Sequence, residues 1–111
     1  MNKPIEIALT DEADQFLTAL PLAVRKRFVT AFEKTEGGFK GDWFLKLSNT
    51  EDIWEFRVDG PNHTFRLFAF WDSRGETETL VVCTHGLDKK TPKTPKADIA
   101  KAERIRREYL G

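Results

Sequence analysis

A cluster of lysines near the end of the chain is the feature most able to do chemistry. The stretch HGLDKKTPKTPK, residues 85–96, contains one acidic residue, Asp88, and four lysines: Lys89, Lys90, Lys93 and Lys96. Ammonium and guanidinium groups bind phosphate oxygens. The whole chain is neutral, with 18 basic and 18 acidic side chains. The local excess of positive charge therefore indicates an anion-binding site.

Two arginines lie on predicted strands before this stretch, and the first residue of the stretch, His85, ends a third predicted strand. Arg57 lies in IWEFRV, Arg66 in TFRLFAFW and His85 at the end of ETLVVCTH. On adjacent strands they would share one face, with Lys46 at its edge and the lysines around its rim. The pKa of His85 suits acid–base chemistry near neutral pH. Nearby rings could stack the unpaired bases of a single-stranded nucleic acid; the candidates are Trp54, Phe68 and Trp71.

Structural interpretations of the same residues stay open at this point. The lysine-rich stretch would then be a solvated connector, and Glu55 would neutralise Arg66 across the sheet. His85 would only satisfy a hydrogen bond at a strand end. The aromatic residues would belong to the core.

Several other classes of site are not expected. The chain has two histidines and one cysteine, Cys83, which is too few for a zinc site or an internal disulfide. No glycine-rich phosphate loop follows a strand. No metal or cofactor is therefore expected. The N-terminus lacks the apolar stretch of a signal peptide, and no run approaches the roughly 18 apolar residues of a membrane span. A cytoplasmic protein without membrane contact is expected.

The pattern of apolar residues predicts the elements that position these groups. Alternation predicts strands at 4–9, 43–47, 53–58, 64–71 and 78–85. Helical spacing predicts a hairpin of two helices over 11–37 and a last helix from about Lys96 to Leu110, with Thr94 as its N-cap. We expect one α+β domain over 1–111, with an antiparallel meander, a first strand at its edge and the helices on one face.

Four segments occur in an order typical of one family. They are FLKL, IWEFRV, TFRLFAFW and GLDKKTPKTP, and a basic C-terminal helix follows them. This order resembles the RelE/ParE superfamily of bacterial toxins, and best its phage-derived, HigB-like branch. That branch shows a KL…LWELR segment, a YR.FYF strand and a GF.KK..KTP loop. The resemblance covers nearly the whole chain and implies a RelE-like fold.

The resemblance implies the toxin of a type II toxin–antitoxin pair. Many such toxins cut messenger RNA in the ribosomal A site, where the ribose 2′-hydroxyl attacks the adjacent phosphate without a metal ion. Arg66 matches the strand arginine used against the scissile phosphate, and Arg57 matches the arginine of ELR. Lys89 and Lys90 match the paired lysines that hold RNA or assist proton transfer, and His85 is a further catalytic candidate. The predicted RNA contacts are Lys46, Lys89, Lys90, Lys93 and Lys96.

The partners that the resemblance implies are a helix-turn-helix antitoxin, the ribosome and messenger RNA. Operator DNA would be reached only through the antitoxin. Two alternatives use the same scaffold. One is a ParE-like inhibitor of DNA gyrase, and the other is a catalytically silent relative that acts only in a DNA-bound repressor complex with the antitoxin.

Overall fold

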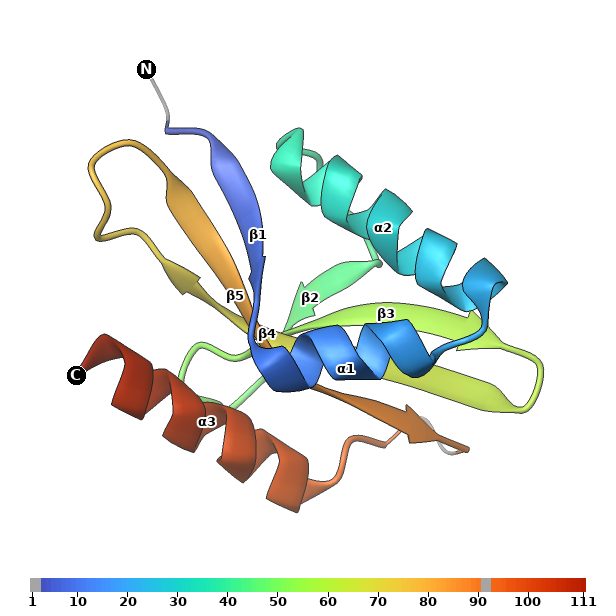
Figure 1. Cartoon of the computed structure of the whole chain (residues 1–111). Coiled ribbons are helices and arrows are strands. Elements are labelled where there is room, and N and C mark those ends of the chain that lie inside the picture. Colours follow the sequence, from blue (N-terminus) through green and yellow to red (C-terminus); the bar gives the residue numbers. More distant parts are fainter. Residues whose placement is uncertain (1–2, 91–92) are drawn as a thin grey trace.

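The computed structural model describes residues 3–90 and 93–111. Five strands and three helices follow the predicted order β-α-α-β-β-β-β-α (Figure 1). They are β1 (Ile5–Leu9), α1 (Asp11–Ala19), α2 (Leu22–Glu36), β2 (Phe44–Lys46), β3 (Trp54–Gly60), β4 (His63–Asp72), β5 (Thr79–Lys89) and α3 (Lys96–Leu110).

The strands form one sheet in the order β1-β5-β4-β3-β2. Strands β2 to β5 make the predicted antiparallel meander. Strand β1 joins its edge parallel to β5, with Ile5 opposite Thr79 and Leu9 opposite Cys83. The sheet is therefore mixed. The predicted α+β class is confirmed, and the arrangement is consistent with a RelE-like fold.

Local sequence signals account for the beginning of α1. The Thr10 hydroxyl accepts a hydrogen bond from the Ala13 amide at 3.1 Å and donates one to the Thr84 carbonyl at 2.7 Å. Acidic residues fill the first turn of α1, where they suit the positive end of the helix dipole. The cap thus starts the helix and also fixes it to β5.

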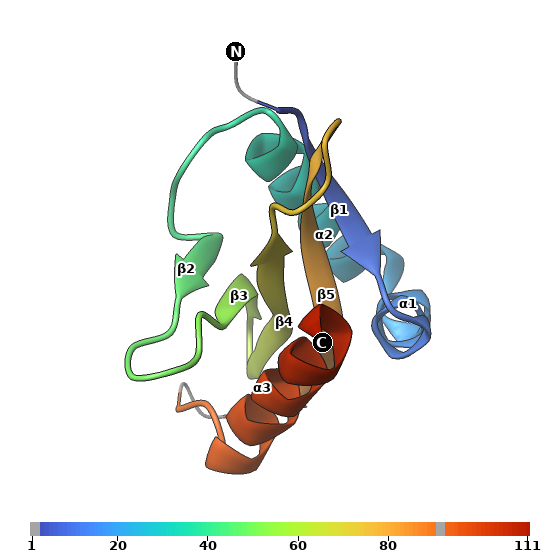
Figure 2. The same ribbon diagram turned by 90° about the vertical axis from the view of Figure 1, so that its left-hand side faces the viewer.

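The core is divided between the two faces of the sheet. On β4, Leu67 and Ala69 pack with α1 and α2, whereas Phe68 and Phe70 pack with Ala102 of α3. Figures 1 and 2 show α3 on the other side of the sheet from α2. The expectation that all helices cover one face is wrong, because β4 carries apolar side chains on both faces and each face has to be covered.

Strand β5 is longer than predicted and contains a bulge. Leu67 pairs with Gly86 and Ala69 with Cys83, so the one residue between them on β4 faces two on β5. The strand continues to Lys89. The expectation of a loop starting at His85 is therefore wrong for its first five residues.

The beginning of α3 also differs from the prediction. Its N-cap is Pro95, and no side chain caps it. The Thr94 hydroxyl instead contacts residues of the sheet. None of the helices in the described part of the chain has the length and apolarity needed to span a membrane.

Candidate functional site

The guanidinium of Arg66 lies at the centre of a buried group of charges on the α3 face of the sheet. Arg66 is only 1% exposed. Its Nη1 donates to the Asp59 carboxylate at 2.7 Å and to the Phe65 carbonyl at 2.9 Å, and its Nε lies 3.6 Å from Oε1 of Glu55. The guanidinium is therefore enclosed, whereas direct contact with a scissile phosphate, the role that the resemblance implies, would need it to be open. Pairing with Glu55, the structural alternative, is what the structure contains.

Glu55 is the residue that sequence reasoning valued too little. It is 5% exposed, and Oε1 lies 3.6 Å from Nε of Arg66 and 3.7 Å from Nε of Arg57. Its Oε2 accepts a hydrogen bond from the Thr94 hydroxyl at 3.4 Å. Burial raises the pKa of Glu55, and the charges of Arg66, Arg57 and Lys89 oppose that rise. The only signal for this role in the sequence was an acidic residue between two apolar residues of a predicted strand.

Lys89 reaches the same place from the end of β5. Its side chain is almost buried, and Nζ donates to the Thr94 hydroxyl at 3.3 Å. Burial lowers the pKa of Lys89, and the charge of Arg66 lowers it further. Thr94 therefore lies between the ammonium of Lys89 and the carboxyl of Glu55.

Arg57 and Asp59 form the more accessible edge of the group. Arg57 is half-buried, and Asp59 is exposed. The hydrogen bond from Arg66 lowers the pKa of Asp59. We call the group formed by Glu55, Arg57, Asp59, Arg66 and Lys89 the charged cluster. It contains three cations and two carboxylates.

The charged cluster has the components of acid–base chemistry at a phosphate. Burial raises the pKa of the Glu55 carboxyl and lowers that of the Lys89 ammonium, so both groups move toward the range where a base and an acid work near neutral pH. Two guanidinium groups flank the carboxyl and can balance negative charge that develops nearby.

His85 is not part of the charged cluster. Its Nδ1 lies 3.0 Å from the Thr84 hydroxyl and its Nε2 lies 3.3 Å from Asp98 of α3. The ring is 2% exposed and rests on Phe68, 4.8 Å between centroids. Burial lowers its pKa, and the charge of Lys101 adds to that effect. The hydrogen bonds match the structural interpretation of this histidine.

The other predicted lysines are exposed but are not all on one face. Three of them lie in the connection between β5 and α3 or at the start of α3: Lys90, Lys93 and Lys96. Lys46 pairs in register with Trp54, whose side chain packs on the α1 and α2 side. Cross-strand partners point to the same face. Lys46 therefore lies on the opposite face from Arg66, and its ammonium is 4.0 Å from Asp52.

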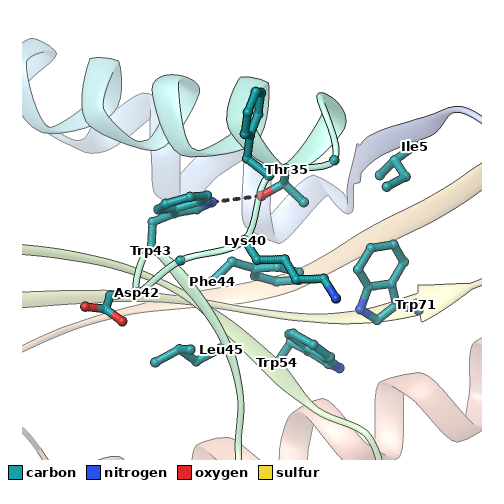
Figure 3. A pocket seen from close by; sticks show the side chains of 12 residues that line it. Ile5, Thr35, Lys40, Asp42, Trp43, Phe44, Leu45, Trp54 and Trp71 are labelled. Carbon is teal, nitrogen blue, oxygen red and sulfur yellow. Dashed lines mark hydrogen bonds between the residues drawn. The ribbon is translucent and has the colours of Figure 1, made fainter.

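None of the expected rings is available for stacking beside Arg66. Phe68 is fully buried. Trp54 and Trp71 instead line a cavity of about 330 Å³ with Trp43 and Phe44. Figure 3 shows this cavity between the end of α2 and the sheet, with Asp42 turned away from Lys40. Among the described residues, no three His, Cys, Asp or Glu side chains are grouped as a metal site would require.

Comparison with known proteins identifies the family of this chain. No curated protein matches the chain. A family model described as "Phage derived protein Gp49-like (DUF891)" matches residues 15–107, a range that includes every member of the charged cluster. That family belongs to the RelE/ParE toxin-like superfamily. Because the match covers most of the chain and agrees with its fold, the protein belongs to the Gp49-like family.

Proposed function

We propose that this chain is the HigB-like toxin of a type II toxin–antitoxin pair and that it cleaves messenger RNA on the ribosome. The observation that carries the proposal is the buried carboxyl of Glu55, held within 3.7 Å of the Nε atoms of two arginines and joined through Thr94 to Lys89. Membership of the Gp49-like family supports a toxin role.

In this scheme the Glu55 carboxylate takes the proton of a ribose 2′-hydroxyl. The hydroxyl oxygen attacks the adjacent phosphorus, and the bond to the 5′-oxygen breaks. The ammonium of Lys89 gives its proton to the leaving oxygen. The products are a 2′,3′-cyclic phosphate and a free 5′-hydroxyl, so atoms and charges balance without a metal ion. A positioned base or acid contributes about 10²–10⁴-fold to the rate.

The buried arginine has a different role from the one that the sequence suggested. Because Arg66 is enclosed and bound to Asp59, it positions Glu55 and supplies a fixed positive charge beneath the reacting phosphate. The half-buried Arg57 and the exposed lysines Lys90, Lys93 and Lys96 hold the flanking phosphates. RNA reaches Glu55 by displacing the Thr94 hydroxyl, whose hydrogen bond to it is long, at 3.4 Å.

The same proposal includes the partners. A helix-turn-helix antitoxin would neutralise the toxin, and operator DNA would be bound only through that antitoxin. The ribosome would present the messenger, and the site of action would be the cytoplasm.

The test is to add the purified chain to a translating bacterial extract and map the messenger by primer extension. We expect cuts within translated codons and cyclic phosphate ends. Translation that stops while the messenger stays intact would reject cleavage. A supercoiling assay with purified gyrase would then detect the ParE-like activity, and inactivity in both assays would favour the silent relative.

A further inference from the structure

A groove on the other side of β3 carries a second group of cations. It has a volume of about 210 Å³ and lies between α2 and the edge of β3, past the point where pairing with β2 ends. The Arg57 amide donates to the Trp43 carbonyl at 2.9 Å beside it. The lining residues are Arg27, Thr30, Ala31, Lys34, Trp43, Arg57 and Val58. We call this the α2 groove.

The charge of the α2 groove is all of one sign. Three of the residues that line it are basic and none is acidic. Neither Arg27 nor Lys34 forms an ion pair with any acid in the described part of the chain. Clustered charge of one sign raises the local concentration of the opposite ion. The groove therefore favours an anion.

The cations are held in place before any anion arrives. Nη1 of Arg27 donates to the Asp59 carbonyl at 2.6 Å. The ammonium of Lys34 lies 4.7 Å from the centre of the Trp43 ring, and the Trp43 indole N–H donates to the Thr35 hydroxyl at 3.2 Å. Pre-organised donors lose less conformational entropy when they bind a ligand.

Arg57 connects the α2 groove to the charged cluster. Its Nε lies 3.7 Å from Glu55 on one side of β3, and the residue also lines the groove on the other side. An anion in the groove would thus lie next to the place where the proposed reaction occurs. A polymer with regularly spaced negative charges can occupy both places at once, which a single small anion cannot do.

We propose that the α2 groove binds a phosphate of the RNA strand next to the reacting one. This inference rests on the proposed function, because RNA is chosen as the occupant on the ground that the groove adjoins the charged cluster. The phosphate oxygens meet Arg27 and Lys34, next to Arg57. The groove fixes the register of the strand and contributes to binding, while Glu55 and Lys89 carry out the chemistry.

The test measures binding without cleavage. A fluorescent hexanucleotide with 2′-O-methyl riboses lacks the attacking hydroxyl, so its anisotropy reports affinity alone. We expect Arg27→Met and Lys34→Met each to weaken binding severalfold at low salt and to reduce the slope of log affinity against log salt by roughly 0.7. Lys26→Met is the matched control, because Lys26 is exposed on the same helix and does not line the groove.

The possible outcomes separate the inference from the proposed function. Equal affinities and salt slopes for the two groove variants and the Lys26 control would overturn the inference, as would absence of binding to the wild-type chain. An oligoglutamate peptide that displaces the hexanucleotide as well as unlabelled RNA does would reassign the groove to an acidic protein segment. Groove-dependent binding without cleavage in the extract would reject the endonuclease and keep the RNA groove. For cleavage itself we expect the groove variants to raise KM and leave kcat unchanged.

Discussion

Substitution of Arg66 is expected to damage the fold as well as any activity. Arg66→Met leaves Glu55 buried at 5% exposure with its nearest cation removed. Removal of one partner from a buried ion pair costs about 3–5 kcal/mol. Domains of this size have a free energy of unfolding of roughly 5–15 kcal/mol. The variant should therefore lose a large part of its stability.

The expected change in melting temperature follows from the size of the chain. Each kcal/mol shifts the midpoint by about 4 °C for a domain near 100 residues, so Arg66→Met should melt roughly 12–20 °C below the wild type. Removal of the second charge by Glu55→Gln should recover about 1–3 kcal/mol in the double variant, because the two side chains are in contact. The exposed carboxyl of Asp59 and the half-buried Arg57 then lose their partners.

The assay is urea unfolding of the wild type, both single variants and the double variant, followed by far-UV circular dichroism. Arg104→Met is the control, because this exposed arginine makes only a long ion pair within α3. It should change stability by less than about 0.5 kcal/mol. Exposed ion pairs contribute less than about 1 kcal/mol to the free energy of unfolding. If Arg66→Met loses no more than that and shows no coupling to Glu55, the burial of this pair is refuted.

Two further predictions concern stability. Gly86→Ala should cost about 1–3 kcal/mol, because an added Cβ would lie 2.1 Å from the ring of Phe16; Gly60→Ala, where nothing lies within 4 Å, is the control, and equal melting temperatures for the two would contradict the packing. The hydrogen bonds from Arg74 lower the pKa of Asp72 from 3.8 to about 2, so stability should fall as the pH is lowered from about 4 to 2. Asp72→Asn should flatten the dependence of the free energy of unfolding on pH between about 4 and 2. An unchanged pH dependence in this variant would contradict the pairing of Asp72 with Arg74.

The elements could be predicted because their periodicity is local. Alternation in the strands and helical spacing in the helices fixed both type and order. The two-faced core was also present in the sequence, since Leu67 and Phe68 are neighbours on one strand and both are apolar. A strand buried on both faces needs cover on both, and this should have placed α3 opposite α2.

The site could be predicted only in part, because its chemistry depends on register and burial. The sequence pointed to Arg66, Arg57 and Lys89, which do lie together. It did not show that Arg66 would be enclosed or that burial would raise the pKa of Glu55. Both effects arise from neighbours far away in the chain. His85 shares the α3 face with the arginines, but its contacts with Phe68 and Asp98 hold it under α3 and away from the charged cluster, and these contacts have no local signal in the sequence.

The most direct test of the catalytic role of the charged cluster is the rate of messenger cleavage by Glu55→Gln in the translating extract. The rate is normalised to the folded fraction and compared with that of Glu33→Gln, which changes an exposed acid on α2. Loss of a general base predicts a fall of about 10²-fold or more for Glu55→Gln, and no change for Glu33→Gln. Cleavage by folded Glu55→Gln at the wild-type rate would contradict the account.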